Sequence, residues 1–214
     1  MSGVNARRQT RRERAAATRE RIVAAATAVF TEAGYGGARM NDVASRAGVA
    51  VQTVYFAFHT KGELLQACFE RAVLGPEKVP PAEQAFYAKL LGARSGRAAI
   101  AAFVEGNTAI NERAAAIKVV AASVPHEPDA AAVVENSEKL RRQGLAEIVT
   151  IVAERFGLRT GVDVATATDI MLLMSSPDAY LTLTGYGWGR DRYVAWLTDA
   201  LAREILARPG SRGR

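Results

Sequence analysis

The 214-residue sequence contains one cysteine, Cys68, and two histidines, His59 and His126. A single cysteine excludes an intramolecular disulfide and is typical of a reducing compartment. So few cysteines and histidines leave no Cys/His cluster for a zinc site, and no Ser/His/Asp or Cys/His set indicates catalysis. We therefore expect neither a metal nor a cofactor, and a protein that is not an enzyme. Cys68 is expected to be a buried, inert thiol.

Long apolar runs are also missing. Thr, Arg, Glu or Asp interrupts each run before it reaches the 18 or more residues of a membrane span. The arginines near the N-terminus are not followed by an apolar stretch with a cleavage site. We therefore predict a cytoplasmic protein without membrane contact, and the 49% apolar and 23% charged residues are close to the average for soluble globular proteins.

The net charge of +6 lies entirely in the first 61 residues, which hold ten Lys/Arg and four Asp/Glu. The remaining 153 residues hold 18 of each sign. A basic segment joined to a neutral one indicates that the first part binds a polyanion. Two interpretations stay open for the N-terminal arginines: an arm that enters the DNA minor groove, or a solvated tail that adds affinity by counterion release. These arginines are Arg7, Arg8, Arg11 and Arg12.

Apolar residues recur at helical spacing throughout, and no alternating run is long enough for a sheet, so the sequence predicts an all-α fold. Gly34 and Gly48 are expected to end the first and second helices. The composition break at Gly75–Pro81 is the candidate domain boundary. Charged residues at Glu135–Arg142 are expected to form an exposed helix face. The expected helices span residues 14–33, 40–47, 51–57, 61–74, 82–92, 96–114, 115–123, 129–156, 162–183 and 191–207.

The stretch between Gly34 and Lys61 predicts a helix-turn-helix, because two short helices meet at a glycine-bearing turn. Gly48 can adopt the left-handed conformation that reverses the chain there. Three valines are expected to face inward: Val43, Val49 and Val54. Ordinary helix packing is the alternative interpretation.

The solvent face of the short helix 51–57 suits the DNA major groove. Gln52 can pair with adenine, and the side chains of Val51 and Thr53 can touch the methyl group of thymine. Arg39 and Asn41 lie at the N-terminus of the preceding helix, where backbone N–H groups favour a phosphate. These phosphate contacts would position the duplex, and helix 51–57 would specify its sequence.

This stretch resembles the TetR family of transcriptional regulators over residues 16–68. The matching elements are Phe30, Gly34-Tyr35, Asp42-Val43-Ala44, Ala47-Gly48-Val49, Thr53-Val54-Tyr55, Phe58, Lys61 and Leu64-Leu65. The family's DNA contacts carry over to Arg39, Asn41, Val51, Gln52, Thr53, Tyr55, Phe56 and Lys61. The sequence departs from the family pattern at Ala50, where Ser or Thr usually caps the helix, at Val51 and Phe56, where polar or basic residues are common, and at His59, where proline is frequent.

The resemblance implies an all-α fold in which an N-terminal three-helix helix-turn-helix domain precedes a larger helical effector-binding and dimerisation domain (about nine helices). The expected organisation is a flexible basic arm at 1–13, a DNA-binding domain at 14–61, a connecting helix and linker at 62–81, and a ligand-binding and dimerisation domain at 82–214. The last two helices are expected to pair with a second copy, although an internal core would also explain their apolar faces. Candidate ligand contacts are Phe86, Tyr87, Phe103, Asn107 and Ser123, although plain core packing is the first explanation for each of them.

The resulting hypothesis is a homodimeric regulator, expected to be a repressor, that binds a palindromic operator on double-stranded DNA and is released by a small apolar or amphipathic effector. The alternatives are an activator, a regulator without a ligand, a helical enzyme with incidental nucleic-acid binding, and a non-specific architectural protein.

Overall fold

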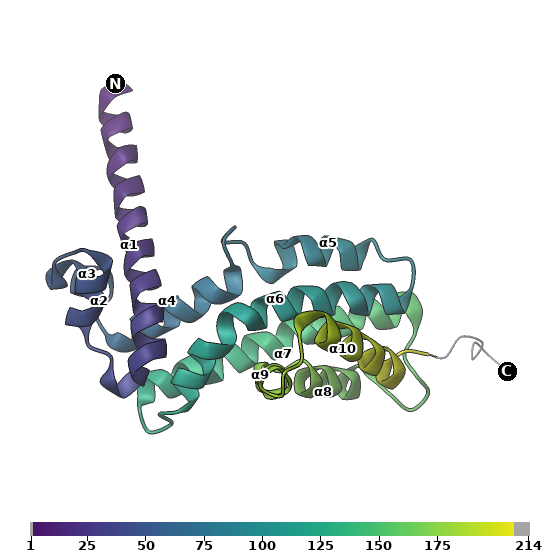
Figure 1. The fold of residues 1–214 in the computed structure, drawn as a ribbon. Coiled ribbons are helices and arrows are strands. Elements are labelled where there is room, and N and C mark those ends of the chain that lie inside the picture. Colours follow the sequence, from purple (N-terminus) through teal and green to yellow (C-terminus); the bar gives the residue numbers. More distant parts are fainter. Residues whose placement is uncertain (1, 208–214) are drawn as a thin grey trace. The chain divides into compact units, whose positions relative to one another are not determined.

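The computed structural model describes the backbone of residues 2–207 and the side chains of residues 12–207. Helices account for nearly all of the regular structure in this range, apart from an isolated antiparallel bridge between Leu158 and Leu206. The all-α prediction is confirmed. The elements, shown in Figure 1, are α1 (Ser2–Gly37), α2 (Met40–Ala47), α3 (Val51–Ala57), α4 (Lys61–Leu74), the 3-10 helix η1 (Pro81–Glu83), α5 (Ala85–Leu91), α6 (Gly96–Ala122), α7 (Pro128–Phe156), α8 (Val164–Met174), α9 (Pro177–Gly185) and α10 (Arg190–Ile205).

The chain forms two compact units. The first combines Met1–Arg71 with Ala116–Val134, and the second combines Ala72–Ala115 with Glu135–Arg214. The division falls within α4, just before the linker expected at 75–81. The segment 116–134, at the end of α6 and the start of α7, belongs to the first unit, which the sequence alone did not suggest.

The core of the first unit is built on the apolar face of α1. Ile22, Val23 and Phe30 are buried there, and the ring of Phe30 stacks on Tyr35 with 5.9 Å between centroids. Leu64 and Leu65 of α4 are fully buried in the same cluster. This core holds the helix-turn-helix against α1.

The first helix begins at Ser2 rather than at about residue 14 as predicted. No proline interrupts this segment, and its Arg, Glu, Gln and Ala residues are good helix formers. Gly34, with φ 69° and ψ 172°, breaks the helical path where the sequence predicted the end of the helix. The side chains of Arg7, Arg8 and Arg11 lie outside the described residues, so their role as a minor-groove arm or solvated tail stays a prediction.

After α5, two predicted helix boundaries were wrong. Residues 96–122 form one helix, α6, instead of two, because the alanine-rich stretch around Ala114 and Ala115 contains no glycine or proline to stop it. Residues 162–183 form two helices, α8 and α9, instead of one kinked helix. The break is produced by Ser176, whose hydroxyl accepts a hydrogen bond from the Ala179 N–H (3.0 Å), with Pro177 at the first position of α9.

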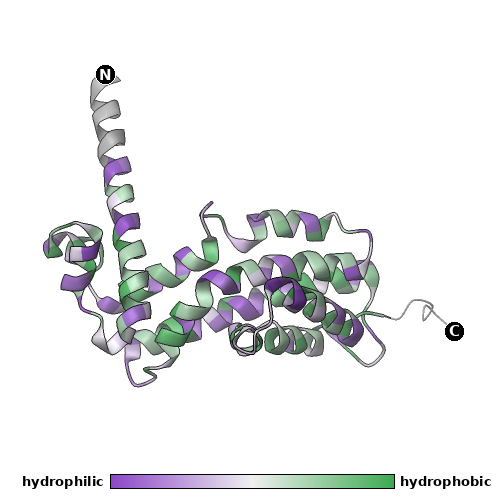
Figure 2. Cartoon of the chain, viewed as in Figure 1, coloured by the Kyte–Doolittle hydropathy of each residue, from purple (hydrophilic) through white to green (hydrophobic). Residues whose placement is uncertain are grey.

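The second core lies between α6, α7, α8 and α10. It buries Phe103, Val149, Met171 and Leu197, and α10 packs on α8. Hydrophilic and hydrophobic residues alternate along α10 in Figure 2, as on an amphipathic helix. In the part of the chain that the structure describes, no helix has both the length and the apolar character needed to cross a membrane.

Candidate nucleic-acid interface

The turn between α2 and α3 has the geometry of a helix-turn-helix. Gly48 adopts φ 65° and ψ 42°, the left-handed conformation predicted for it. Its N–H donates to the Ser45 carbonyl (3.2 Å), and the Val49 N–H donates to the Ala44 carbonyl (3.0 Å). These bonds close the end of α2 and turn the chain into α3.

Helix α3 has one buried face and one exposed face. Val54 is fully buried, and the Phe58 ring that follows α3 is buried with the Arg19 guanidinium 4.2 Å from its centroid. On the other face, Gln52 is exposed, and Tyr55 and Phe56 are 50% and 89% exposed. Two aromatic rings therefore lie exposed beside Gln52 on the same side of α3.

The remaining predicted residues of α3 are less exposed. Val51 and Thr53 are half-buried, and Val51 packs against the first core. Ala50, at the N-cap, provides no side-chain hydrogen bond to α3, as expected for a residue without a side-chain oxygen. Helix α3 is therefore held by its buried face and not by a cap.

The N-terminus of α2 carries two exposed polar side chains, Arg39 and Asn41. Arg39 is the N-cap residue, and it makes no side-chain hydrogen bond to the helix. The first backbone N–H groups of α2 and the Arg39 guanidinium can both hydrogen-bond an anion. This arrangement suits a phosphate at the start of α2.

Lys61 is held by a partner that the sequence did not indicate. Its Nζ donates to the Tyr35 carbonyl (2.8 Å) and lies 4.2 Å from the centroid of the Tyr35 ring. This contact uses one of the three ammonium donors, so the side chain can still contact a phosphate while its position is fixed.

Arg46, on α2, forms a bidentate ion pair with Glu32 of α1, at 2.7 and 2.8 Å. The hydrogen bonds from Arg46 lower the pKa of the Glu32 carboxyl. Because both side chains are largely exposed, the pair adds little stability, but it orients the guanidinium toward α1.

The start of α4 is capped by its own side chains. The Thr60 hydroxyl accepts from the Glu63 N–H (3.0 Å), and the Glu63 carboxylate accepts from the His59 N–H (3.0 Å). This hydrogen bond from His59 lowers the pKa of Glu63. The arrangement resembles a capping box, so the position where the TetR pattern often has proline serves here to begin α4.

Comparison with known proteins matches the same segment. Residues 22–68 match the family model described as bacterial regulatory proteins, tetR family. The HTH-type transcriptional regulator CymR from Pseudomonas putida is 45% identical over 64 residues, which cover 30% of this chain and 32% of CymR. The similarity to the tetR family is thus located in the helix-turn-helix segment of this chain. The match thus spans about a third of the length of this curated relative.

Solved structures extend the similarity of fold to most of this chain. FadR from Bacillus subtilis in complex with stearoyl-CoA has a TM-score of 0.66 and 17% identity over 85% of this chain and 96% of FadR. A putative regulator from Saccharomonospora viridis in complex with choline has a TM-score of 0.69 and 18% identity over 90% and 100%. A putative TetR-family regulator from Mesorhizobium loti has a TM-score of 0.68 and 19% identity over 90% and 98%. At this identity the similarity shows the fold alone.

The predicted ligand residues are only partly brought together in the structure. Phe86 of α5 lies against Gly106 of α6, where an added Cβ would stand 2.0 Å from the ring carbon Cγ. Phe103 is buried in the second core, and Tyr87 packs against it half-buried. Ser123 belongs to the first unit, and its hydroxyl donates to the Val120 carbonyl (2.8 Å).

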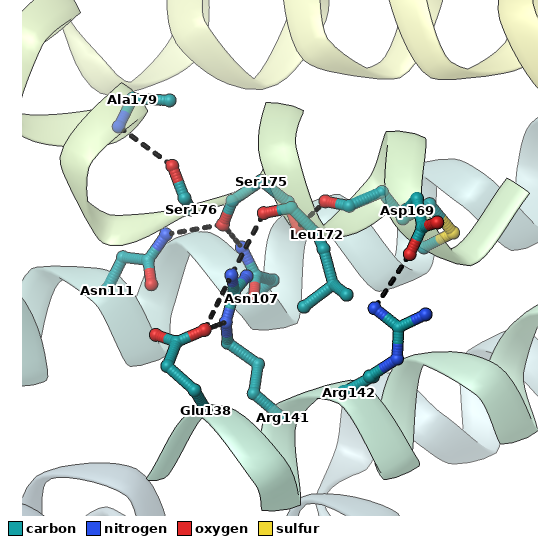
Figure 3. A network of polar contacts seen from close by, with 11 residues as sticks. Asn107, Asn111, Glu138, Arg141, Arg142, Asp169, Leu172, Ser175, Ser176 and Ala179 are labelled. Carbon is teal, nitrogen blue, oxygen red and sulfur yellow. Dashed lines mark hydrogen bonds and ion pairs between the residues drawn. The ribbon is translucent and has the colours of Figure 1, made fainter. Parts of the chain in front are cut away.

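Asn107 belongs to a polar network that the sequence analysis missed. Its side chain and that of Asn111 donate to the Ser175 carbonyl, at 2.9 and 3.1 Å, and Arg141 donates to the Leu172 carbonyl at 2.9 Å (Figure 3). The network supplies hydrogen-bond donors to backbone carbonyls at the end of α8, where the helix stops before α9 begins. Two asparagines four residues apart on an apolar helix face were the sequence signal for it.

The prediction of an exposed face at 135–142 was wrong for Arg141, whose side chain is only 21% exposed. It reaches inward from α7 because the carbonyl of Leu172 and the carboxylate of Glu138 satisfy its guanidinium.

Cys68 is buried, as predicted, and burial raises the pKa of its thiol to about 11. Between residues 12 and 207, no group of three or more His, Cys, Asp or Glu side chains is arranged to hold a metal ion.

Proposed function

We propose that the chain is a homodimeric transcriptional regulator whose two copies of α3 read a palindromic operator in double-stranded DNA. The exposed face of α3 carries this proposal: Gln52, Tyr55 and Phe56 stand in water on a helix whose opposite face is buried. The excess of positive charge in residues 1–61 supports the same partner. Such a regulator acts in the cytoplasm, where bacterial DNA lies.

The proposed division of contacts follows from chemistry. Arg39, Asn41 and Lys61 bind phosphates, because an ammonium, a guanidinium and backbone N–H groups at a helix start all favour anions. Val51, Gln52, Thr53, Tyr55 and Phe56 contact base edges. DNA binding is thus assigned to residues 14–61, with 62–81 as the connection to a ligand-binding and dimerisation domain at 82–214.

The chemistry of α3 favours A·T base pairs in the contacted half-site. The helix, Val51–Ala57, contains no charged residue, so it has no arginine or lysine for the bidentate contact with guanine. Nearby Arg46 is paired with Glu32. Gln52 suits adenine, and the Phe56 ring suits the methyl group of thymine.

Dimerisation through α8, α9 and α10 is supported by the apolar side chains that these helices expose. Leu173 of α8 is 74% exposed, and Trp196 of α10 is 36% exposed. A second copy packed on this face would bury these side chains. The two half-sites of the proposed operator lie about one helical turn of DNA apart.

We further propose that the regulator is a repressor released by a small apolar or amphipathic molecule. Two structural neighbours were solved with small ligands, stearoyl-CoA and choline, which supports a ligand site in the second unit. Release is a population shift: the ligand must bind more tightly to the dimer that does not fit the operator.

The test is selection of bound fragments from random DNA by the full chain. The expected result is a symmetric, A·T-containing site whose affinity falls steeply as salt rises. Gln52→Ala should lose the site, while Gln143→Ala, the same change at an exposed position of α7, should retain it. Recovery of fragments without symmetry would contradict the proposal, and equal affinity for scrambled DNA would indicate an architectural protein.

A further inference from the structure

Three buried side-chain atoms in the second unit have no hydrogen-bond partner: Thr108 Oγ1, Arg141 Nη1 and Tyr193 Oη. Thr108 and Tyr193 are fully buried. Buried polar groups are nearly always paired, because an unpaired one has lost its hydrogen bonds to water without replacement. Three such atoms indicate a place where another molecule supplies the missing partner.

The Thr108 hydroxyl lacks a hydrogen bond that other threonines in the helices of this protein make. The hydroxyls of Thr150, Thr168 and Thr184 donate to the carbonyl four residues earlier, at 2.7–2.8 Å. This local bond is the usual one for threonine inside a helix. Thr108 Oγ1 does not make it, so its hydroxyl is left to a partner outside its own helix.

Ion pairs that join α6 and α10 lie within one helical turn of both Thr108 and Tyr193. Thr108 lies three residues after Glu105 and four before Glu112, and both carboxylates pair with Arg190, at 2.7 and 3.3 Å. Tyr193 follows Arg190 by three residues on α10. Because residues three or four apart share one face of a helix, we infer that the two hydroxyls lie near the contact that these ion pairs make between α6 and α10.

Arg141 reaches the same region from α7. Its Nη2 donates to the Leu172 carbonyl, and its Nε and Nη2 contact the Glu138 carboxylate at 3.3 and 3.2 Å, which leaves Nη1 without a partner (Figure 3). Burial raises the pKa of Tyr193 to about 12, and the positive charge of Arg141 acts in the opposite direction, as a nearby cation does. Tyr193 therefore keeps its proton at neutral pH and can donate it.

The core around the Tyr193 ring is apolar. The Tyr180 ring lies 5.2 Å from the Tyr193 ring, and Phe103, Val104 and Met171 belong to the same core cluster as Tyr193. A guanidinium N–H can only donate, and the two hydroxyls can donate as well. The complementary molecule thus has an apolar body and an oxygen that accepts hydrogen bonds.

We propose that Thr108, Arg141 and Tyr193 form the polar end of the effector site and bind the carbonyl or carboxylate oxygen of a small, otherwise apolar molecule. The inference rests on the proposed function, because it assigns the ligand class of the molecule that releases the operator. A buried water is the competing occupant, and the experiment separates the two.

The experiment is calorimetric titration of the full chain with acetophenone, benzoate and ethylbenzene at millimolar concentration. The three probes share a phenyl ring and carry a carbonyl, a carboxylate or no acceptor. At least one of the first two is expected to bind about tenfold more tightly than ethylbenzene, the gain of a buried hydrogen bond. If acetophenone binds more tightly than benzoate, the site prefers a neutral carbonyl oxygen. If benzoate binds more tightly, the site prefers an anionic carboxylate oxygen.

Tyr193→Phe and Thr108→Val each remove one unpaired hydroxyl and keep the shape of the side chain. Both should abolish the preference for the acceptor while leaving the melting temperature of the unliganded protein unchanged or raised. Tyr186→Phe, at an exposed tyrosine, is the matched control, and it should change neither the preference for the acceptor probes nor the melting temperature. A lower melting temperature in Tyr193→Phe, combined with equal or absent binding of all probes, would indicate an ordered water only and would overturn the proposal.

Operator binding by the same proteins keeps the two proposals apart. If the wild-type chain binds its selected operator but shows no preference for acceptor probes, the effector chemistry is wrong and the DNA-binding function stands. If the wild-type chain selects no operator, the proposed function itself fails.

Discussion

Replacing Phe56 with alanine is expected to weaken operator binding by removing contacts with thymine methyl groups. The ring is 89% exposed in the free protein, so almost its whole surface is available to be covered by DNA. It lies on a helix without charged residues, which makes apolar contact its main contribution. The change should leave the fold intact, because no core contact is lost.

The size of the effect follows from buried area. A phenylalanine side chain that is fully buried covers about 150–250 Å². If roughly 50 Å² of the ring is covered in the major groove, the loss at about 25 cal/mol per Å² is about 1.2 kcal/mol, or about eightfold in affinity. Replacing one contacted thymine by uracil removes a single methyl group and should cost about 0.8 kcal/mol, or about fourfold.

Fluorescence anisotropy with the selected operator and its uracil-substituted form measures both effects. The wild-type protein should discriminate thymine from uracil, and Phe56→Ala should lose most of this discrimination. Leu140→Ala, an exposed apolar residue on α7, is the matched control and should retain it. If the ratio of affinities for the thymine and uracil operators is the same in the wild type and in Phe56→Ala, this interpretation of α3 is refuted.

Three other predictions concern a pair of helical glycines, the single cysteine and Arg39. Gly144→Ala should raise the free energy of unfolding by about 1 kcal/mol, because nothing lies within 4 Å of the added Cβ and alanine favours the helix. Gly106→Ala, by contrast, places its Cβ against the Phe86 ring and should be destabilised relative to Gly144→Ala by roughly 1–3 kcal/mol in urea unfolding; equal stabilities would show that the ring moves away freely. The Cys68 thiol, with a pKa of about 11, should resist alkylation at neutral pH until the protein unfolds, and rapid labelling of the native protein would contradict its burial. Arg39→Ala should weaken binding to all DNA sequences alike and reduce the slope of log affinity against log salt by about 1, whereas a loss confined to one sequence would indicate a base contact.

The helix-turn-helix was predictable from the sequence because local rules determine it. Gly34 and Gly48 adopt the positive φ angles that end the first two helices, and Val43 and Val54 are buried on the faces that their spacing indicated. The contacts of Lys61 with Tyr35 were not predictable, because 26 residues separate them and only the folded chain brings the ammonium to that carbonyl.

The second unit was less predictable because its helices carry few start and stop signals. Ala114 and Ala115 suit the middle of a helix as well as its end, so the break expected there is absent. Pro177 was recognised, but a kink and a full break differ only in whether Ser176 caps a new helix. The inward position of Arg141 depends on the carbonyl of Leu172, which lies 31 residues away.

The central claim is that the exposed face of α3 reads a symmetric DNA site. The most direct measurement compares the affinities of the full chain and of Gln52→Ala/Tyr55→Ala for the selected palindrome and for a scrambled duplex of equal composition. We expect the wild type to prefer the palindrome and the double variant to bind both duplexes with the same, weaker affinity. A double variant that still prefers the palindrome would contradict the account.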